Sequence, residues 1–381
     1  MLLPLASLDR WVALAGSGCL SALALWLVTA SSQLLASSPS PVAPETSPAP
    51  KPEIRLTIKA VGDTIMGTNF PHNDLPSGDP YRLFQAVQNQ LQGADILFGN
   101  YEATLTNHPI SEKAVNGFSV FAFRAPPEYA RALKKAGFDI LSVANNHTYD
   151  FGEQGFADTV RSIETAGMRA VGKRGQIVYL EVKGIKVAFI GFSNYADHNS
   201  VLDLKGTRAI VQKAKRNAQI VVVSFHAGAE GTGAMRTRNA TEYFFGENRG
   251  NVVLFSRTAI NSGADLVLGH GPHVVRALEL YKGRLIAYSL GNFMGYRTLS
   301  TVGELGWSLV LEVQLDQQGN FISGKIHPLQ LTGEGVPQPD PKGKTICLMR
   351  SLTRQDFPTT PLSIQEEGTI TVLSKQPQPN R

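Results

Sequence analysis

Residues 142–152 contain four side chains of kinds that bind metal ions or transfer protons, namely Asn145, Asn146, His147 and Asp150. The amide oxygen of an asparagine can ligate a metal ion, while a neighbouring imidazole exchanges protons near neutral pH. The same segment also fits an Asn-rich turn in which Asp150 caps the helix that follows. Both interpretations remain open when this segment is considered alone.

Four other short polar segments carry side chains of the same kinds, and each follows an apolar run that predicts a strand. Their candidate ligands are Asp63, Asn100 with Glu102, His226, and His270 with His273. Carboxylate, amide and imidazole groups without a thiol suit divalent first-row ions such as Mn, Fe or Zn. We therefore predict a pair of divalent metal ions, with Glu102 as the acid that bridges them.

Each of these residues also has a structural interpretation. Asp63 follows a glycine, which is a common signal of a strand that ends in a turn. His226 follows a run of valines and fits a hydrogen-bonded imidazole of the core, and Glu102 fits a surface carboxylate. His270 and His273, on a rigid Gly-Pro turn, have fewer structural uses. Because five separate segments end in ligand types, the sequence favours one shared site.

The elements around these segments predict a mixed α/β protein. Strands that end near candidate ligands are expected at residues 54–61, 95–98, 138–143, 219–224 and 265–268. Helices are expected at residues 128–136, 153–166, 205–217 and 251–262, and hairpins at 177–190 and 277–289. Since ligands of α/β proteins bind beyond the carboxyl ends of the strands, the candidate side chains are expected to meet at one edge of a sheet.

Composition limits the possible partners. The chain has 381 residues, of which 43% are hydrophobic and 18% charged, enough for a sizeable core. The net charge of +5 comes from scattered basic residues with no stripe of Lys and Arg among aromatics, so nucleic acid is not expected as a partner. Two cysteines, Cys19 and Cys347, exclude a disulfide framework and a thiolate zinc site.

The first 53 residues differ in character from the rest. Residues 11–36 are uncharged and long enough to span a bilayer, so they fit either a cleaved signal peptide or an uncleaved anchor. Their length favours a membrane-anchored, extracytoplasmic protein, whereas cleavage would give a secreted or periplasmic one. We expect the segments 1–36 (signal or transmembrane), 37–53 (Pro/Ser-rich linker), 54–333 (main domain), 334–375 (C-terminal extension) and 376–381 (tail).

A set of motifs in this chain resembles the CapA family of poly-γ-glutamate capsule-synthesis proteins, which are related to calcineurin-like metallophosphoesterases. The motifs are GDTIM at 62–66, GNYE at 99–102, FRAPP at 123–127 with LKKAGF at 133–138, ANNHTYDFG at 144–152, HAGAE at 226–230, GADLVLGHGPH at 263–273 and YSLGNF at 288–293. They occur in family order and cover about residues 56–331.

The resemblance implies a four-layer sandwich of mixed sheets flanked by helices, with a dinuclear metal site. The ligands that it implies are Asp63, Glu102, Asn146, His226, His270 and His273. It further implies that His147 donates a proton to the leaving oxygen and that Asp150 orients this loop.

This chain departs from the pattern of its relatives at three positions. Ala227 stands where many relatives have Trp, and Gly271 stands where many have His, with His270 one place earlier. Ile65 stands where ordinary metallophosphoesterases have a histidine, a difference shared by the CapA family that thins the ligand shell of one ion.

The resemblance implies a role in making, releasing or anchoring an anionic polymer like poly-γ-glutamate, by metal-assisted hydrolysis or transfer and together with a polymer-synthase complex. Two alternatives are a non-catalytic polymer-binding or assembly subunit with a metal site, and a phosphatase or phosphodiesterase acting on another phosphoester of the cell envelope. Residues 231–250 carry Arg236, Arg238 and Arg249, which fit either contacts to an anionic substrate or a solvated loop.

Overall fold

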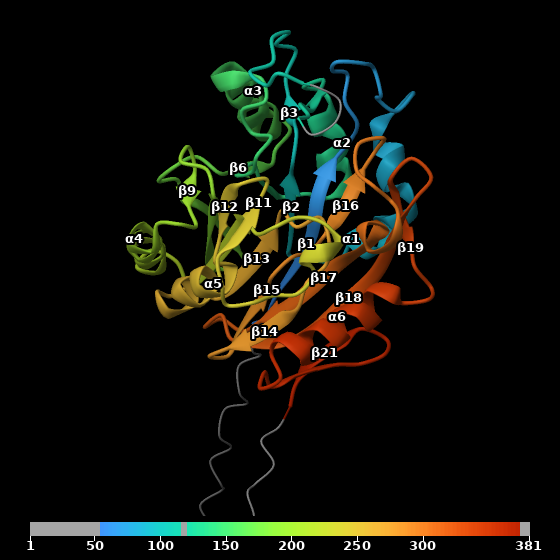
Figure 1. Cartoon of the computed structure of the whole chain (residues 1–381). Coiled ribbons are helices and arrows are strands. Elements are labelled where there is room, and N and C mark those ends of the chain that lie inside the picture. The colour runs from blue at the N-terminus through green and yellow to red at the C-terminus, as the bar shows by residue number, and fades with distance from the viewer. Residues whose placement is uncertain (1–53, 116–119, 374–381) are drawn as a thin grey trace, which may run out of the picture. The chain divides into compact units, whose positions relative to one another are not determined.

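The computed structural model describes residues 54–115 and 120–373. The segments predicted at 1–36, 37–53 and 376–381 lie outside the described residues. Within the described ranges, no helix has both the length and the apolar character needed to cross a bilayer. The description below therefore concerns the α/β part of the chain, shown in Figure 1.

The larger of the two main sheets has ten strands and is mixed. At its centre, β1 (Leu56–Ile65) pairs in parallel with β2 (Ile96–Tyr101) and antiparallel with β17 (Trp307–Leu315). The other strands of this sheet are β5 (Ile140–Ser142), β6 (Arg169–Val171), β16 (Asn292–Gly295), β18 (Phe321–Thr332), β19 (Val336–Pro339), β20 (Leu362–Ile364) and β21 (Thr369–Val372). Asp63 thus lies on a central strand.

The smaller sheet has seven strands, and its centre is parallel. β10 (Ile220–His226) lies between β8 (Ile185–Ser193) and β13 (Leu266–His270) and pairs in parallel with both. The remaining strands are β7 (Val178–Val182), β9 (Asn199–Ser200), β14 (Leu278–Tyr281) and β15 (Arg284–Ala287). The two hairpins predicted from the sequence are β7–β8 and β14–β15, so both are confirmed.

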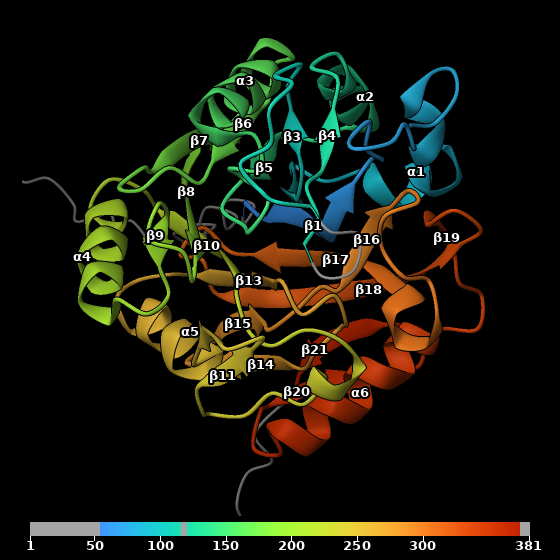
Figure 2. The same ribbon diagram turned by 45° about the horizontal axis from the view of Figure 1, so that its top comes forward.

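The helices pack mainly on the outer faces of the sheets. They are η1 (Pro80–Val87), α1 (Gln88–Leu91), α2 (Tyr129–Ala136), α3 (Gly152–Thr165), α4 (Leu204–Lys215), η2 (Thr232–Ala234), α5 (Val252–Asn261), η3 (Gly303–Gly306) and α6 (Lys344–Asp356). Figure 2 shows α2 and α3 beside the larger sheet and α4 and α5 beside the smaller one. Two short pairs of strands, β3 (Thr104–Leu105) with β4 (Arg124–Ala125) and β11 (Glu242–Phe244) with β12 (Glu247–Gly250), complete the elements.

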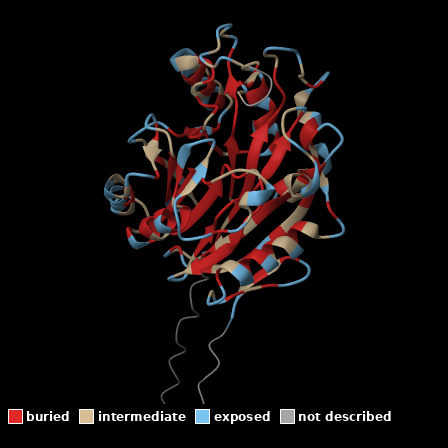
Figure 3. Cartoon of the chain, in the orientation of Figure 1, coloured by how far each residue is buried: buried red, intermediate tan, exposed pale blue. Residues whose placement is uncertain are grey.

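Three apolar clusters hold these layers together. The first lies between the sheets and joins Ile58 and Phe98 of the larger sheet to Val222 of the smaller one. The second packs η1, α2 and α3 on the outer face of the larger sheet, and the third packs α4 and α5 on the smaller sheet. Figure 3 shows the strands as buried and much of the helix and loop surface as exposed. The expected mixed α/β sheets flanked by helices are confirmed.

Local sequence signals account for several helix boundaries. Helix α2 ends at Gly137, whose φ of 109° lies in the left-handed region that glycine adopts without strain. Helices α4 and α5 begin after Asp203 and Asn251, whose side chains accept 2.9 Å hydrogen bonds from the amides of Gly206 and Leu254. These boundaries agree within a few residues with those predicted.

The strands that carry the site run further than their apolar segments predict. β1 continues to Ile65, β10 includes His226 and β13 includes His270. Asp63 and Asn100 also lie inside their strands instead of in the loops that follow. Backbone pairing, more rigid than a loop, therefore fixes the positions of these side chains.

Candidate metal centre and proton-transfer site

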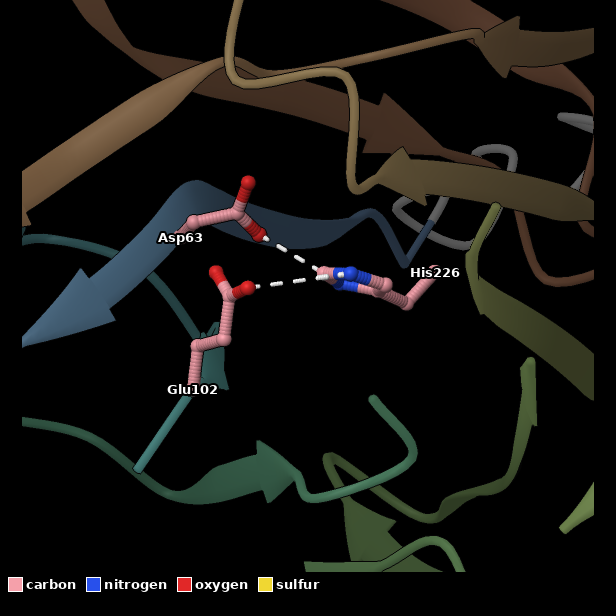
Figure 4. A group of neighbouring side chains, drawn as sticks. All are labelled: Asp63, Glu102 and His226. Atoms are coloured by element: carbon pink, nitrogen blue, oxygen red, sulfur yellow. Dashed lines mark ion pairs between the residues drawn. The ribbon is translucent and has the colours of Figure 1, made fainter. Parts of the chain in front are cut away.

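Three buried side chains converge between the two sheets: Asp63 of β1, Glu102 just after β2, and His226 at the end of β10. Figure 4 shows the two carboxylates directed at the imidazole ring. Nδ1 of His226 lies 3.8 Å from Oδ1 of Asp63, and Nε2 lies 3.7 Å from Oε1 of Glu102. One ligand atom from each residue lies within 4.8 Å of the others, which is the spacing of donors around a shared ion. The larger sheet thus supplies the acids and the smaller sheet the base.

A bulge in β1 directs Asp63 toward this cluster. The register between β1 and β2 shifts between Ala60 and Asp63, and such a shift re-aims the following side chain. Gly62 makes the close approach possible, because a Cβ atom there would lie 2.0 Å from the carbonyl oxygen of Gly291. The amide of Asp63 then donates a 2.9 Å hydrogen bond to the same carbonyl. The glycine before Asp63 is therefore a packing requirement.

Asn100 contributes to the cluster through its amide nitrogen. Its Nδ2 donates to Oδ1 of Asp63 at 2.8 Å and lies 3.3 Å from Nδ1 of His226. Its Oδ1 accepts a hydrogen bond from Nδ2 of Asn145 at 3.2 Å. Because the oxygen is engaged on the far side, Asn100 in this orientation holds Asp63 and His226 in place, in contrast to the predicted role of metal ligand.

His273 lies beside both acids and adopts a φ of 57°, which is rare outside glycine. Its Nδ1 lies 3.2 Å from Asp63 and 2.8 Å from Oδ1 of Asn292, and its Nε2 lies 3.6 Å from Glu102. Burial alone lowers the pKa of His273, but the negative charge of Glu102 and the hydrogen bond to Asp63 outweigh it and raise the pKa to about 10. His273 is thus placed to balance the buried negative charge.

The other charges of the cluster follow from burial and from one another. Burial raises the pKa of Glu102 well above its usual range, and the charge of Asp63 raises it further. Burial also tends to raise the pKa of Asp63, but the hydrogen bond and charge of His273 hold it below its usual value. Burial lowers the pKa of His226, which favours the neutral ring that ligates metals.

His147 stands at the side of the cluster, oriented by Asp150. Its Nδ1 lies 2.8 Å from Oδ2 of Asp150, and its Nε2 lies 4.0 Å from Oε1 of Glu102. Asp150 also accepts a hydrogen bond from the amide of Phe123 at 2.7 Å and forms an ion pair with Nζ of Lys113 at 2.6 Å. Burial lowers the pKa of His147, the negative charge of Asp150 opposes this, and the positive charge of Lys113 adds to it.

The alternative interpretation of Asp150 as a helix cap is wrong. Phe151 occupies the N-cap position of α3 without a side-chain hydrogen bond, while the Asp150 carboxylate turns inward to His147. Asn145 anchors the same loop, because its Oδ1 accepts a hydrogen bond from the amide of His147 at 3.0 Å. Its Nδ2 donates to the carbonyl of Tyr101 at 2.9 Å, which ties the loop to β2.

Two predicted ligands occupy different surroundings from the three-residue cluster. Nε2 of His270 lies 3.1 Å from the carbonyl oxygen of Val61, and its ring packs 5.9 Å from that of Phe98. Its Nδ1 is buried without a hydrogen-bond partner among the described residues, so His270 stays a predicted ligand. Asn146 lines the same cavity as Glu102 and His147, and its buried Oδ1 has no hydrogen-bond partner among the described residues.

Unsatisfied polar atoms indicate that the cluster fits a cation. Both carboxylate oxygens of Glu102 and Nε2 of His226 are buried without a hydrogen-bond partner in the described part of the chain. Leaving such groups unpaired costs roughly 1–3 kcal/mol each, and more when they are charged. A divalent ion would satisfy these atoms and offset the charges of two neighbouring buried acids.

The cluster opens on a cavity of about 680 Å³ whose lining adds residues that the sequence did not assign to the site. Buried Arg249 pairs with Glu230 at 3.0 Å and with Glu247 at 3.3 Å. Glu230 is the last residue of the HAGAE motif, and Arg249 is one of the arginines that fit contacts to an anionic substrate. No sequence pattern around Lys113 predicts its place in the cavity. Arg236 pairs with Asp356 instead, and Arg238 is exposed.

Comparison with known proteins gives the following matches. A family model described as "Bacterial capsule synthesis protein PGA_cap" matches residues 57–296. The chain is 29% identical over 315 residues to "Capsule biosynthesis protein CapA" of Bacillus anthracis, covering 75% of this chain and 69% of that protein. It is 28% identical over 327 residues to "PGA biosynthesis protein CapA" of Bacillus subtilis (strain 168), covering 78% of each.

Among solved structures, the chain matches the NAD nucleotidase of Haemophilus influenzae with a TM-score of 0.37 and 11% identity. The match covers 75% of this chain and 54% of that one.

Proposed function

The chain belongs to the bacterial capsule synthesis protein PGA_cap family, and from this we propose that it is a metal-dependent enzyme of capsule polymer synthesis. Its substrate would be an anionic polymer of the poly-γ-glutamate kind, or the group through which such a polymer is released or attached. The reaction would be hydrolysis or transfer, carried out in the cavity beside Glu102 and His147.

One observation supports this proposal above all others: unpaired ligand atoms lie next to an oriented imidazole. Glu102 and His226 have buried donor atoms without hydrogen-bond partners among the described residues. His147, held by Asp150, turns its Nε2 toward Glu102 at 4.0 Å. A metal centre and a proton-transfer group so close together are the two components that hydrolysis of an ester or amide requires.

The surroundings of the cluster favour catalysis over a purely structural metal site. Structural sites are closed by protein ligands on all sides, whereas catalytic sites keep a position open for substrate. Glu102, His147 and His273 all line the cavity of about 680 Å³, so a substrate has access to them. This access argues against a metal site that serves the fold alone.

When bound, one or two divalent ions would polarise the substrate and make a coordinated water more acidic. Asp63, Glu102 and His226 would hold such ions, with His273 and Asn146 beside them. Asn100 keeps Asp63 and His226 in position through its amide nitrogen. When doubly protonated, His147 would deliver the proton on Nε2 to the leaving atom, which is oxygen in an ester and nitrogen in an amide, while Asp150 fixes the ring through Nδ1.

We also propose that the protein works outside the cytoplasm, with the apolar residues 11–36 as its anchor or signal. The uncharged stretch is long enough to span a bilayer, and the Pro-rich linker after it would separate the catalytic part from the membrane. Protease accessibility of the full chain in intact cells tests this location, and digestion only after cell lysis would contradict it.

A second candidate, hydrolysis of a phosphoester in another envelope component, is favoured by the charges of the cavity. Among its described lining residues, the cations are Lys113, Arg249 and His273, whose pKa is raised to about 10. All three lie beside carboxylates, so the side chains leave little positive charge to attract a chain of carboxylates. A single anionic ester at the metal ligands would need no further cations.

The experiment is a metal and turnover assay on the purified full chain. We expect bound Mn, Fe or Zn by elemental analysis, and turnover of either poly-γ-glutamate or bis(p-nitrophenyl) phosphate that is lost in Asp63→Asn and His147→Ala. Asp197→Asn and His108→Ala, which change the same residue types away from the cavity lining, should behave as wild type. Bound metal without turnover of either substrate would contradict the enzyme and favour the assembly subunit.

A further inference from the structure

The cavity beside the metal cluster has an aromatic wall that the chemistry described so far does not use. The wall consists of Phe121, Phe123, Phe244 and Phe245. These residues come from two distant parts of the sequence, the segment before β4 and the β11–β12 hairpin. All four line the same cavity as Glu102, His147 and His273.

Phe245 occupies a position that folding alone does not favour. It lies in the two-residue turn between β11 and β12, with a φ of 46°, where Asn, Asp or Gly is preferred. Its side chain is 82% exposed, so the fold recovers little by burying it. A bulky apolar residue in a left-handed turn is an outlier, and such outliers cluster at ligand sites.

The base of the hairpin is fixed, which holds the turn at the cavity. Buried Arg276 forms an ion pair with Glu242 of β11 at 2.7 Å. Glu247 of β12 pairs with Arg249 and also accepts a 2.9 Å hydrogen bond from the hydroxyl of Tyr195. The aromatic tip therefore projects from an anchored hairpin.

The other half of the wall reaches the proton-transfer residue. Phe121 is 45% exposed, and its ring stacks on that of Phe123 with centroids 6.2 Å apart and planes 10° apart. The ring of Phe123 lies 4.4 Å from that of His147. A ring bound against this wall would thus sit next to the bond on which His147 acts.

From the anchored tip, the stacked pair and the paired cations, we infer that the substrate carries an aryl or heteroaryl ring beside its reacting group. The ring stacks on the aromatic wall while the anionic group reaches the divalent ion that Asp63, Glu102 and His226 would hold. This inference rests on the proposed metal-dependent function. Of the substrates proposed above, it favours the group through which the polymer is released or attached, or the envelope phosphoester, over the polymer chain itself. Aromatic stacking and apolar burial then contribute the binding free energy that the paired cationic side chains of the cavity do not contribute.

The test compares three probes of equal charge, namely phenylphosphonate, pentylphosphonate and methylphosphonate. Their binding to the Mn-loaded full chain is measured by isothermal titration calorimetry, so no turnover is needed. We expect phenylphosphonate to bind about tenfold more tightly than methylphosphonate, with pentylphosphonate between them. In Phe245→Ala and Phe121→Ala, the advantage of phenyl over methyl should fall below about threefold.

Tyr243→Ala is the matched control. Tyr243 lies on the same hairpin and is 63% exposed, but it does not line the cavity, so its variant should keep the preference for phenyl. Similar affinities for phenyl and methyl probes in the wild type would overturn the ring inference and leave the metal site standing. Equal affinities for the pentyl and phenyl probes would overturn the inference of an aromatic ring and show that any apolar group binds to the wall. No binding of any probe would contradict the proposed function itself.

Discussion

Glu102 is the residue whose surroundings most clearly fit a bound cation. It is fully buried, both of its oxygens lack hydrogen-bond partners in the described ranges, and Asp63 adds a second negative charge nearby. Burying a charge is costly unless it is paired. His273, with its pKa raised to about 10, offsets the charge of Asp63. Burial raises the pKa of Glu102, so a divalent ion would be needed to stabilise its charged form.

Glu102→Gln tests this requirement. The substitution keeps the size of the side chain but removes the charge, so we expect metal affinity to fall at least about tenfold, as losses of metal-site partners do. Elemental analysis after dialysis against a limiting concentration of Mn measures the loss. Glu247→Gln, a paired carboxylate on the same cavity, should keep its metal. Unchanged metal content in Glu102→Gln would exclude this carboxylate as a ligand.

Asp150→Asn tests the orientation of His147. The asparagine side chain replaces a carboxylate that contacts Nδ1 of His147, accepts a hydrogen bond from the backbone N–H of Phe123 and pairs with Nζ of Lys113. We expect kcat to fall by about two orders of magnitude or more, with little change in KM or metal content, because proton transfer is lost while binding remains. Steady-state kinetics on a substrate with a poor leaving group measures this fall. An equal loss with a good leaving group that needs no proton would point to a structural role for Asp150.

The residues of the site could be predicted where a motif and a strand end coincided, as for Asp63, Glu102, His226 and His273. The orientation of the Asn100 side chain could not be predicted. Its amide has a donor and an acceptor, and the neighbouring residues decide which of the two faces the cluster. Lys113 was missed because it reaches Asp150 from 37 positions away in the chain, with no pattern around it.

At the scale of elements, the sequence predicts the strands and helices well but places the strand ends too early. Polar residues such as Asp63 and His226 interrupt the apolar run, although the backbone ladder continues through them. β16 and the β11–β12 hairpin were missed, because Gly-rich polar segments are typical of loops. The aromatic wall depends on that hairpin, so it was missed as well.

Gly62→Ala tests the bulge that directs Asp63. An added Cβ would lie 2.0 Å from the carbonyl oxygen of Gly291, and backbone atoms cannot move aside easily. We expect a loss of stability of roughly 1–3 kcal/mol together with weaker metal binding, because β1 must shift away from β16. Thermal unfolding and metal titration measure the two effects.

Gly233→Ala is the control for this substitution, since nothing lies within 4 Å of the Cβ position there. It should be close to neutral in both measurements. A Gly62→Ala variant with wild-type stability and metal affinity would show that the close approach of β1 to Gly291 is not required.

At the scale of the whole described fold, the ligand groups are divided between the two sheets. Asp63 and Glu102 belong to the larger sheet, whereas His226 and His273 follow strands of the smaller one. A bound ion stabilises only the folded state, so at 100 times its Kd it adds about 2.7 kcal/mol to the free energy of unfolding.

Metal removal should therefore lower the Tm of the wild type by several degrees, as chelation with EDTA followed by differential scanning calorimetry would show. Readdition of Mn should restore the Tm. Asp63→Asn should unfold at the same temperature with and without EDTA. A wild-type Tm that is insensitive to EDTA would argue that no ion binds between the sheets.

The position of Asp63 and His226 on opposite layers also has a consequence for maturation. Neither layer alone presents a complete set of donors, so a newly made chain would gain high affinity for the ion only after its two sheets have packed together. Uptake of the ion would then depend on complete folding, so a partly folded chain would hold no ion at this site.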